Sequence, residues 1–140
     1  MTLIVIALAA LASVLHHYVF SFQRFTLVVA RHNASSAQAV PELQTLMTPA
    51  FMGALGWLST LAVLAAAVWI GFVFAWWWGI VFFFADAFVF GGILPLFPAR
   101  HHFASLATGE LSRHQSRLPS SLTDALQADI HSVRVSGRVV

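Results

Sequence analysis

Long apolar runs separated by short polar stretches dominate the hydropathy pattern of this 140-residue chain. The first run extends from Leu3 to about Phe22, and about 20 apolar residues are what a helix needs to cross a bilayer. We therefore predict a first transmembrane helix over residues 3–22, with Gln23 and Arg24 at the membrane interface. The residues FTLVVA that come next could extend this helix along or out of the membrane.

The segment from Ala50 to Pro98 holds 49 residues and a single charged side chain, Asp86. As one helix it would measure about 74 Å, whereas the hydrocarbon core of a bilayer is about 30 Å thick. The segment must therefore cross twice. We predict a second transmembrane helix at roughly 50–75 and a third at roughly 80–96.

Residues with strong local preferences set the boundaries of these two helices. Thr48 is a favourable N-cap, and Pro49 suits the first helical position of the second helix. Pro95 and Pro98 should end the third helix, because proline cannot continue one. The reversal is expected at Trp76–Gly79, since indole rings favour the headgroup layer and glycine readily leaves helical geometry. The predicted interface anchors are Trp76, Trp77 and Trp78.

The polar remainder is short. The loop before the second helix contains SSAQAVPELQTLM, which predicts a short helix broken at Pro41. The tail 99–140 contains an amphipathic stretch, Leu122–His131, in which Ser121 and Asp124 have the spacing of a capping box. Its last residues, VRVSGRVV, alternate as in a strand, which would have to pair with another chain or fray. The tail as a whole either lies partly ordered on the membrane or is ordered by a partner.

Composition places the chain in a lipid bilayer. Hydrophobic residues make up 59% and charged residues 9%, whereas soluble domains carry about 25% charged residues. The net charge of only +2 gives no indication of nucleic-acid binding, so none is expected. The absence of cysteine excludes disulfides, thiolate catalysis and iron–sulfur ligation.

The distribution of arginine predicts the orientation. Neither the N-terminus nor the tryptophan-rich reversal contains a basic residue. The seven basic residues lie after the first helix or after the third: Arg24, Arg31, Arg100, Arg113, Arg117, Arg134 and Arg138. The positive-inside rule then places the N-terminus outside and the tail in the cytoplasm. We therefore predict an all-α membrane protein with three spans over residues 1–98 and a cytoplasmic tail. The expected location is a bacterial inner membrane. A two-span arrangement with an interfacial first helix is the alternative.

The N-terminal run also resembles a signal peptide, because Ala10–Ala12 has the pattern of a cleavage site. The run lacks a basic n-region, however, and continues through Val19 and Phe20. We therefore expect it to be retained as a transmembrane helix.

Two sets of residues inside the predicted spans suggest helix packing. Ser13, His17, Ser21 and Arg24 follow helical spacing and form one polar stripe that should face protein. Small residues recur on the other two helices, where they would let helix backbones approach closely. The predicted packing glycines are Gly53, Gly56, Gly71 and Gly91.

Asp86 is the one charged side chain in the second and third spans. Its predicted depth differs by about 10 Å from that of the histidines of the first helix, so direct contact is not favoured. A protonated carboxyl group bonded to Ser59, Thr60 or a backbone carbonyl is one alternative. Pairing with another subunit is the other. An intramembrane carboxylate is a functional candidate by default, although a structural hydrogen bond between helices is the favoured role.

His16 and His17 admit three interpretations. They lie about 100° apart around the helix, so both imidazoles should not reach one point. The favoured interpretation is neutral imidazoles hydrogen-bonded within a helix bundle. The second is axial ligation of haem or a chlorophyll, with Ala12 leaving room for the flat ring. A metal site that includes Asp86 is the least favoured, so none is predicted. His101, His102, His114 and His131 are expected at the surface of the tail.

No residue pattern predicts a catalytic site: there is no glycine-framed nucleophile and no phosphate-binding loop. The favoured function is therefore a non-catalytic accessory subunit of a larger inner-membrane complex, with other membrane subunits as partners. The alternatives are a subunit that binds haem or chlorophyll through His16 or His17, and an oligomeric pore or proton pathway that uses Asp86.

Overall fold

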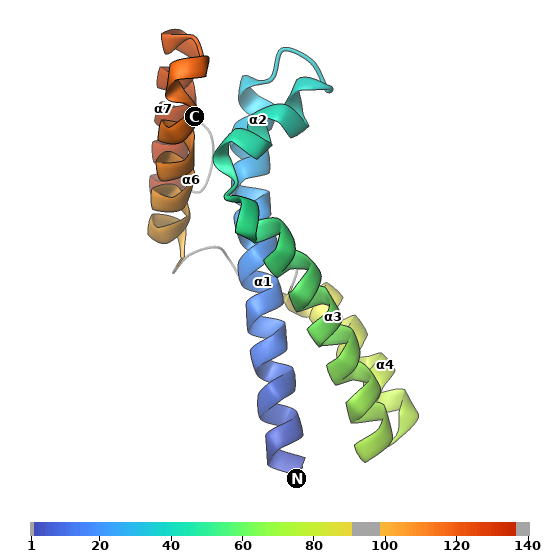
Figure 1. Cartoon of the computed structure of the whole chain (residues 1–140). Coiled ribbons are helices and arrows are strands. Elements are labelled where there is room, and N and C mark those ends of the chain that lie inside the picture. Colours follow the sequence, from blue (N-terminus) through green and yellow to red (C-terminus); the bar gives the residue numbers. More distant parts are fainter. Residues whose placement is uncertain (1, 91–98, 137–140) are drawn as a thin grey trace. The chain divides into compact units, whose positions relative to one another are not determined.

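The computed structural model describes residues 2–90 and 99–136, and these residues form helices and turns without a strand (Figure 1). The all-α prediction is therefore confirmed for the described chain. The chain divides into two compact units. Unit 1 comprises Met1–Phe20 and Gly53–Pro95, and unit 2 comprises Ser21–Met52 and Leu96–Val140.

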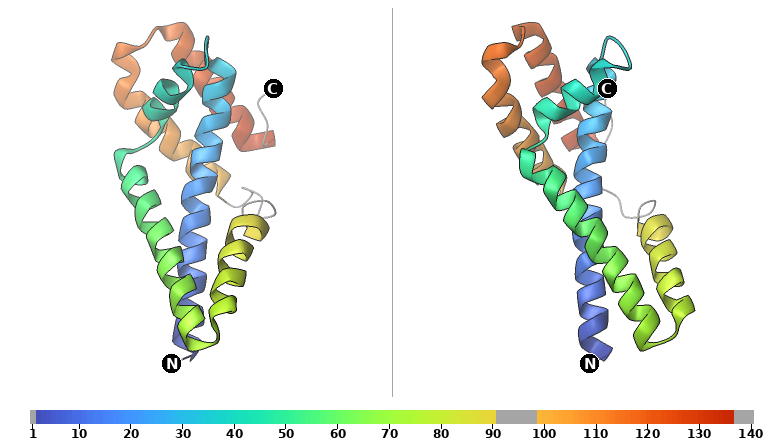
Figure 2. Two further views of the ribbon diagram at one scale, coloured as in Figure 1. Left: turned by 90° about the vertical axis from the view of Figure 1, so that its right-hand side faces the viewer. Right: turned by 45° about the vertical axis from the view of Figure 1, so that its right-hand side comes forward.

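Unit 1 contains the apolar helices. Helix α1, Thr2–Asn33, contributes its first part to this unit. Helix α3, Ala50–Val73, and helix α4, Trp76–Ala85, follow each other as a helical hairpin (Figure 2). Helix α4 continues directly into a π-helix, η1, at Asp86–Phe90.

Two helices, α1 and α3, are long and apolar enough to cross a membrane. In the most apolar 18-residue stretch of each helix, only 28% of α1 and 17% of α3 is buried within the chain. The core helix of a soluble protein would be mostly buried, so neither helix resembles one. Their outer surfaces instead carry large apolar side chains that a bilayer would accept. The most exposed of these are Leu3, Leu11, Val14, Trp57, Leu58 and Phe72.

The reversal between α3 and α4 comes earlier than the sequence suggests. Helix α3 ends at Val73, and Ala75 is extended, with φ −169° and ψ 151°. The three tryptophans form the first turn of α4, where the Trp78 amide donates to the Ala75 carbonyl. Predicting the turn at Trp76–Gly79 was therefore wrong, because two residues, Phe74 and Ala75, suffice to reverse the chain. All three indoles are exposed, and Trp77 and Trp78 stack with ring centroids 4.4 Å apart.

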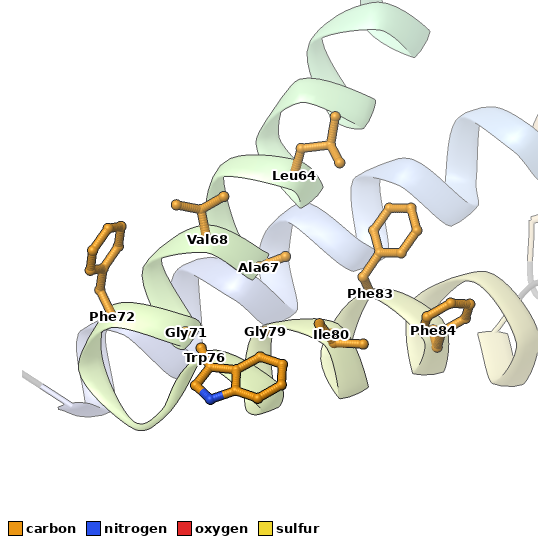
Figure 3. Close-up of a pocket in the computed structure, with 10 residues that line it drawn as sticks. All are labelled: Leu64, Ala67, Val68, Gly71, Phe72, Trp76, Gly79, Ile80, Phe83 and Phe84. Carbon is orange, nitrogen blue, oxygen red and sulfur yellow. The ribbon is translucent and has the colours of Figure 1, made fainter.

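Gly79 serves helix packing and not the turn. A Cβ atom added at Gly79 would lie 2.3 Å from the carbonyl oxygen of Ala67 on α3. At Gly71 an added Cβ would meet Trp76 backbone atoms at 3.5 Å, which is ordinary contact. Gly71 and Gly79 both border an apolar pocket of about 520 Å³ on the hairpin (Figure 3). The absence of a side chain at Gly79 thus lets α4 approach the backbone of α3.

Replacing Gly79 with alanine is expected to destabilise unit 1 by about 1–3 kcal/mol, because the obstructing atom belongs to the backbone and cannot rotate away. Denaturant unfolding in detergent micelles, followed by tryptophan emission, measures this. The matched control is Gly53→Ala, since a Cβ at Gly53 meets nothing within 4 Å. Equal stability of the two variants would contradict the close packing of α4 on α3.

The start of α3 also differs from the prediction. Thr48 closes α2, Ala39–Met47, by donating its hydroxyl to the Gln44 carbonyl at 2.8 Å. Pro49 precedes the first helical residue, and its carbonyl accepts from the Met52 amide. The prediction that Thr48 is the N-cap of this helix was therefore wrong, because its hydroxyl donates to the preceding helix, α2. Helix α2 also includes Pro41, since proline is tolerated in the first turn of a helix.

Unit 2 has a core of its own. It combines the second part of α1 with α2, α6 at Arg100–His114, the 3₁₀ turn η2 at Gln115–Arg117, and α7 at Ser120–Ser136. Phe103 on α6 is fully buried against two rings of α1, with centroids 5.6 Å from Phe22 and 6.1 Å from Phe25. Other fully buried side chains include Val29, Met47, Leu111, Leu126 and Val133.

The tail is more ordered than the sequence indicates. Helix α6 was not predicted, although its buried residues Phe103, Ala107 and Leu111 recur at helical spacing. Helix α7 extends beyond the predicted 122–131, and its Leu126 and Ile130 are buried as expected. The prediction of a capping box at Ser121 was wrong, because the amides of Leu122 and Thr123 donate to the Pro119 carbonyl. The predicted strand was wrong for residues 133–136, which are helical.

Some predicted features fall outside the described residues. These are the packing glycine Gly91, the end of the third span at Pro95 and Pro98, and residues 137–140.

Candidate functional site

Asp86 is buried, with 2% of its side chain exposed. It is the first residue of η1, and its amide is shared between the carbonyls of Phe82 and Phe83 at the end of α4. A π-helical turn widens the backbone, and such turns occur frequently at functional sites.

Three side chains from two turns of α1 bind this carboxylate. The Ser13 hydroxyl donates to Oδ1. His16 approaches Oδ2 through Nδ1 at 2.9 Å, and His17 approaches Oδ1 through Nε2 at 3.2 Å. We call these four residues, Ser13, His16, His17 and Asp86, the Asp86 cluster. All four belong to unit 1.

The prediction that the two imidazoles cannot reach one point was wrong. They lie about 100° apart around α1, but they use different ring nitrogens. Nδ1 of His16 is close to its backbone, whereas Nε2 of His17 is at the far end of the ring. The difference in reach compensates for the difference in direction, and the ring centroids stay 5.6 Å apart.

The predicted difference in depth between Asp86 and the two histidines was also wrong. Because α4 begins at Trp76 and not near Ile80, Asp86 is ten positions into the descending helix. This corresponds to about 15 Å, and the difference in depth from the histidines is smaller than expected. Ser59 and Thr60, the predicted alternative partners, instead donate their hydroxyls to the Gly56 carbonyl.

Charge in unit 1 is confined to this cluster. The segments 1–20 and 53–95 contain no arginine, lysine or glutamate, and their ionisable side chains are His16, His17, Tyr18 and Asp86. An ionised Asp86 therefore has only an imidazolium as a counter-charge in this unit. Because an unpaired charge in a low-dielectric medium is costly, the cluster favours states in which its total charge is zero.

The geometry fits hydrogen bonding to a carboxylate better than metal ligation. Within residues 2–90 and 99–136, no group of three or more ligating side chains could hold a metal ion. Ala12, expected to leave room for a tetrapyrrole, is itself buried. Binding of haem or chlorophyll through His16 or His17 stays a prediction, which a visible absorption spectrum of the purified protein checks.

An apolar cavity of about 620 Å³ borders the cluster. Ser13 and His17 form part of its wall, together with Ile70 on α3, Phe74 in the turn, and Trp78 and Phe82 on α4. The cavity lining is almost entirely apolar, so hydrocarbon and not water is its natural content. The histidine on this side of the cluster therefore faces an apolar environment.

A second carboxylate cluster lies in unit 2. Oδ2 of Asp129 on α7 is 2.6 Å from Nδ1 of His32 and accepts from Nδ2 of Asn33 at 2.6 Å. Gln44 on α2 donates to the Gln23 carbonyl at 3.1 Å. These contacts attach α7 and α2 to the second part of α1, and the sequence pattern did not indicate them.

The other predicted site residues divide between the two units. The C-terminal part of the polar stripe, Ser21 and Arg24, belongs to unit 2. Ser21 is half-buried there, and Arg24 is exposed. Gly53 is exposed on α3. His101, His102 and His131 are exposed as predicted, and His114 is partly covered and lies 3.7 Å from Glu110.

Comparison with protein families, with curated proteins and with solved structures yields no match to this chain.

Proposed function

We propose that this protein is a non-catalytic accessory subunit of a bacterial inner-membrane complex, with three transmembrane helices, N-out. The observation that carries the proposal is the contrast between the two units. The described residues of unit 1 expose many large apolar side chains, whereas all seven arginines fall within the segments of unit 2. Under the positive-inside rule, unit 2 is then the cytoplasmic part.

The third crossing in this proposal includes α4 and η1. The apolar helix Trp76–Phe88 is shorter than a full span. Asp86 favours its insertion beside α1, because Ser13, His16 and His17 satisfy the carboxylate inside the membrane.

Orientation is testable by cysteine labelling, because the natural chain has no cysteine. In intact spheroplasts, a membrane-impermeant maleimide is expected to label Trp77→Cys at the hairpin. Ser121→Cys on α7 should react only after the membrane is permeabilised. Labelling of both positions from the same side would overturn the three-span topology.

The accessory role is supported by the small-residue face at the start of α3. Gly53 is exposed, and a Cβ atom there would meet no described residue within 4 Å, so the position is open to a partner helix. Detergent extraction followed by native mass spectrometry should find the protein in a complex with other membrane subunits. A stable monomer without a partner would contradict the proposal.

A matched pair of variants locates the partner. Gly53→Leu is expected to release the partner without unfolding the chain, because the new side chain enters open space. Gly109→Leu, at a similarly open glycine on α6, should leave the complex intact. Release by Gly109→Leu alone would place the partner on unit 2 instead.

A further inference from the structure

We propose that the Asp86 cluster is a proton-binding site within the membrane, in which one exchangeable proton is shared between the Asp86 carboxylate and the imidazoles of His16 and His17. This inference does not depend on the accessory role. It rests on the position of a single buried carboxylate between two imidazoles of a neighbouring helix.

Charge balance favours one proton on the cluster beyond the single N–H proton that each neutral imidazole carries. With that proton on either histidine, Asp86 is ionised and the cluster has no net charge. With the proton on Asp86, all three groups are neutral. These states differ only in the location of the proton, so none leaves an uncompensated charge in a low-dielectric medium. Loss of the proton, or gain of a second one, would leave the cluster charged.

The distances allow the proton to move without rearrangement of the helices. When it passes from imidazolium to carboxylate, the N–H bond of one ring nitrogen breaks and an O–H bond forms on Asp86. The nitrogen keeps the electron pair. His16 Nδ1 is 2.9 Å from Oδ2 and His17 Nε2 is 3.2 Å from Oδ1, so each oxygen faces its own imidazole. The carboxylate can accept from one ring and donate to the other.

Exchange with the surroundings must pass through the imidazoles. The Asp86 side chain is 2% exposed, whereas the side chains of His16 and His17 are 18% and 14% exposed. The two rings also have different surroundings. His17 borders the apolar cavity, and His16 packs edge-on against Phe20 with ring centroids 4.5 Å apart. The two imidazoles thus have different surroundings, and His16 is the more exposed of the two.

Within the described residues of unit 1, Tyr18 is the one ionisable side chain outside the Asp86 cluster. Helix α1 presents His16 and His17 to Asp86, with Ser13 as a hydrogen-bond donor. Helix α3 contains no ionisable side chain, and in α4 and η1 Asp86 is the only one. Tyr18 is the remaining ionisable side chain of the unit, and in its neutral form it adds no charge.

The test is a pH titration of the purified full-length chain in lipid nanodiscs. Infrared difference spectra follow the carbonyl stretch of the protonated Asp86 carboxyl, which Asp86→Asn identifies by its loss. Nitrogen NMR of labelled histidine follows the protonation of His16 and His17. In the natural chain we expect the carboxyl and imidazole signals to change together, because strongly interacting groups titrate as one unit.

Two substitutions and one control sharpen the result. His16→Gln and His17→Gln should each shift the midpoint of the carboxyl signal, because each removes one of the groups that share the proton. Ser59→Ala should not shift it, because the Ser59 hydroxyl donates to the Gly56 carbonyl of its own helix. If Asp86 and both histidines keep one protonation state over the whole pH range in which the natural chain stays folded, the proposal is wrong. Independent titration of the three groups would also overturn it.

Discussion

Replacing Asp86 with alanine is expected to destabilise unit 1 by about 1–3 kcal/mol for each buried polar group that loses its acceptor. The substitution leaves the Ser13 hydroxyl and two imidazoles on α1 without their acceptor. In a bilayer or micelle interior these groups have little water to replace it. The contact that attaches η1 to α1 would also be lost.

Tryptophan emission measures this effect selectively. All five tryptophans lie in unit 1: Trp57, Trp69, Trp76, Trp77 and Trp78. The midpoint of denaturant unfolding in micelles should fall clearly for Asp86→Ala. Asp86→Asn should have a smaller effect, because an amide oxygen still accepts from Ser13. Unchanged stability of Asp86→Ala would mean that the cluster contributes nothing to the fold.

Replacing Phe103 with alanine is expected to destabilise unit 2 by about 3–5 kcal/mol, because a fully buried aromatic ring is lost and a cavity remains. The ring contacts Phe22 and Phe25 on the second part of α1. Its removal weakens the attachment of α6 to α1. Val135→Ala on α7 is the matched control, since Val135 is exposed and its truncation should change stability by less than about 0.5 kcal/mol.

Hydrogen–deuterium exchange with mass spectrometry checks this second prediction helix by helix. Amides of α2, α6 and α7 should exchange faster in Phe103→Ala. Tryptophan emission should stay close to that of the natural chain, because unit 2 contains no tryptophan. Exchange rates equal to those of the Val135→Ala control would contradict a core centred on Phe103.

The apolar helices could be predicted because their signal is local. Composition and length alone indicate α1 and α3, since a run of about 20 apolar residues satisfies its own backbone hydrogen bonds and buries its side chains in lipid. The burial of Leu126 and Ile130 in α7 was likewise evident from helical spacing. In contrast, α6 was missed, because its buried stripe of Phe103, Ala107 and Leu111 includes a small alanine and lies among polar residues.

The sequence by itself determined that the chain is helical, that its first unit suits a bilayer, and that Asp86 has few possible counter-charges. Only the tertiary structure decided that Ser13, His16 and His17 all bind that carboxylate, since this depends on where the hairpin turns and on which ring nitrogen each histidine uses. The start of α4 at Trp76, four residues before the predicted start, changes the depth of Asp86 by about 6 Å. That distance separates a hydrogen bond from no contact, and hydropathy cannot resolve it.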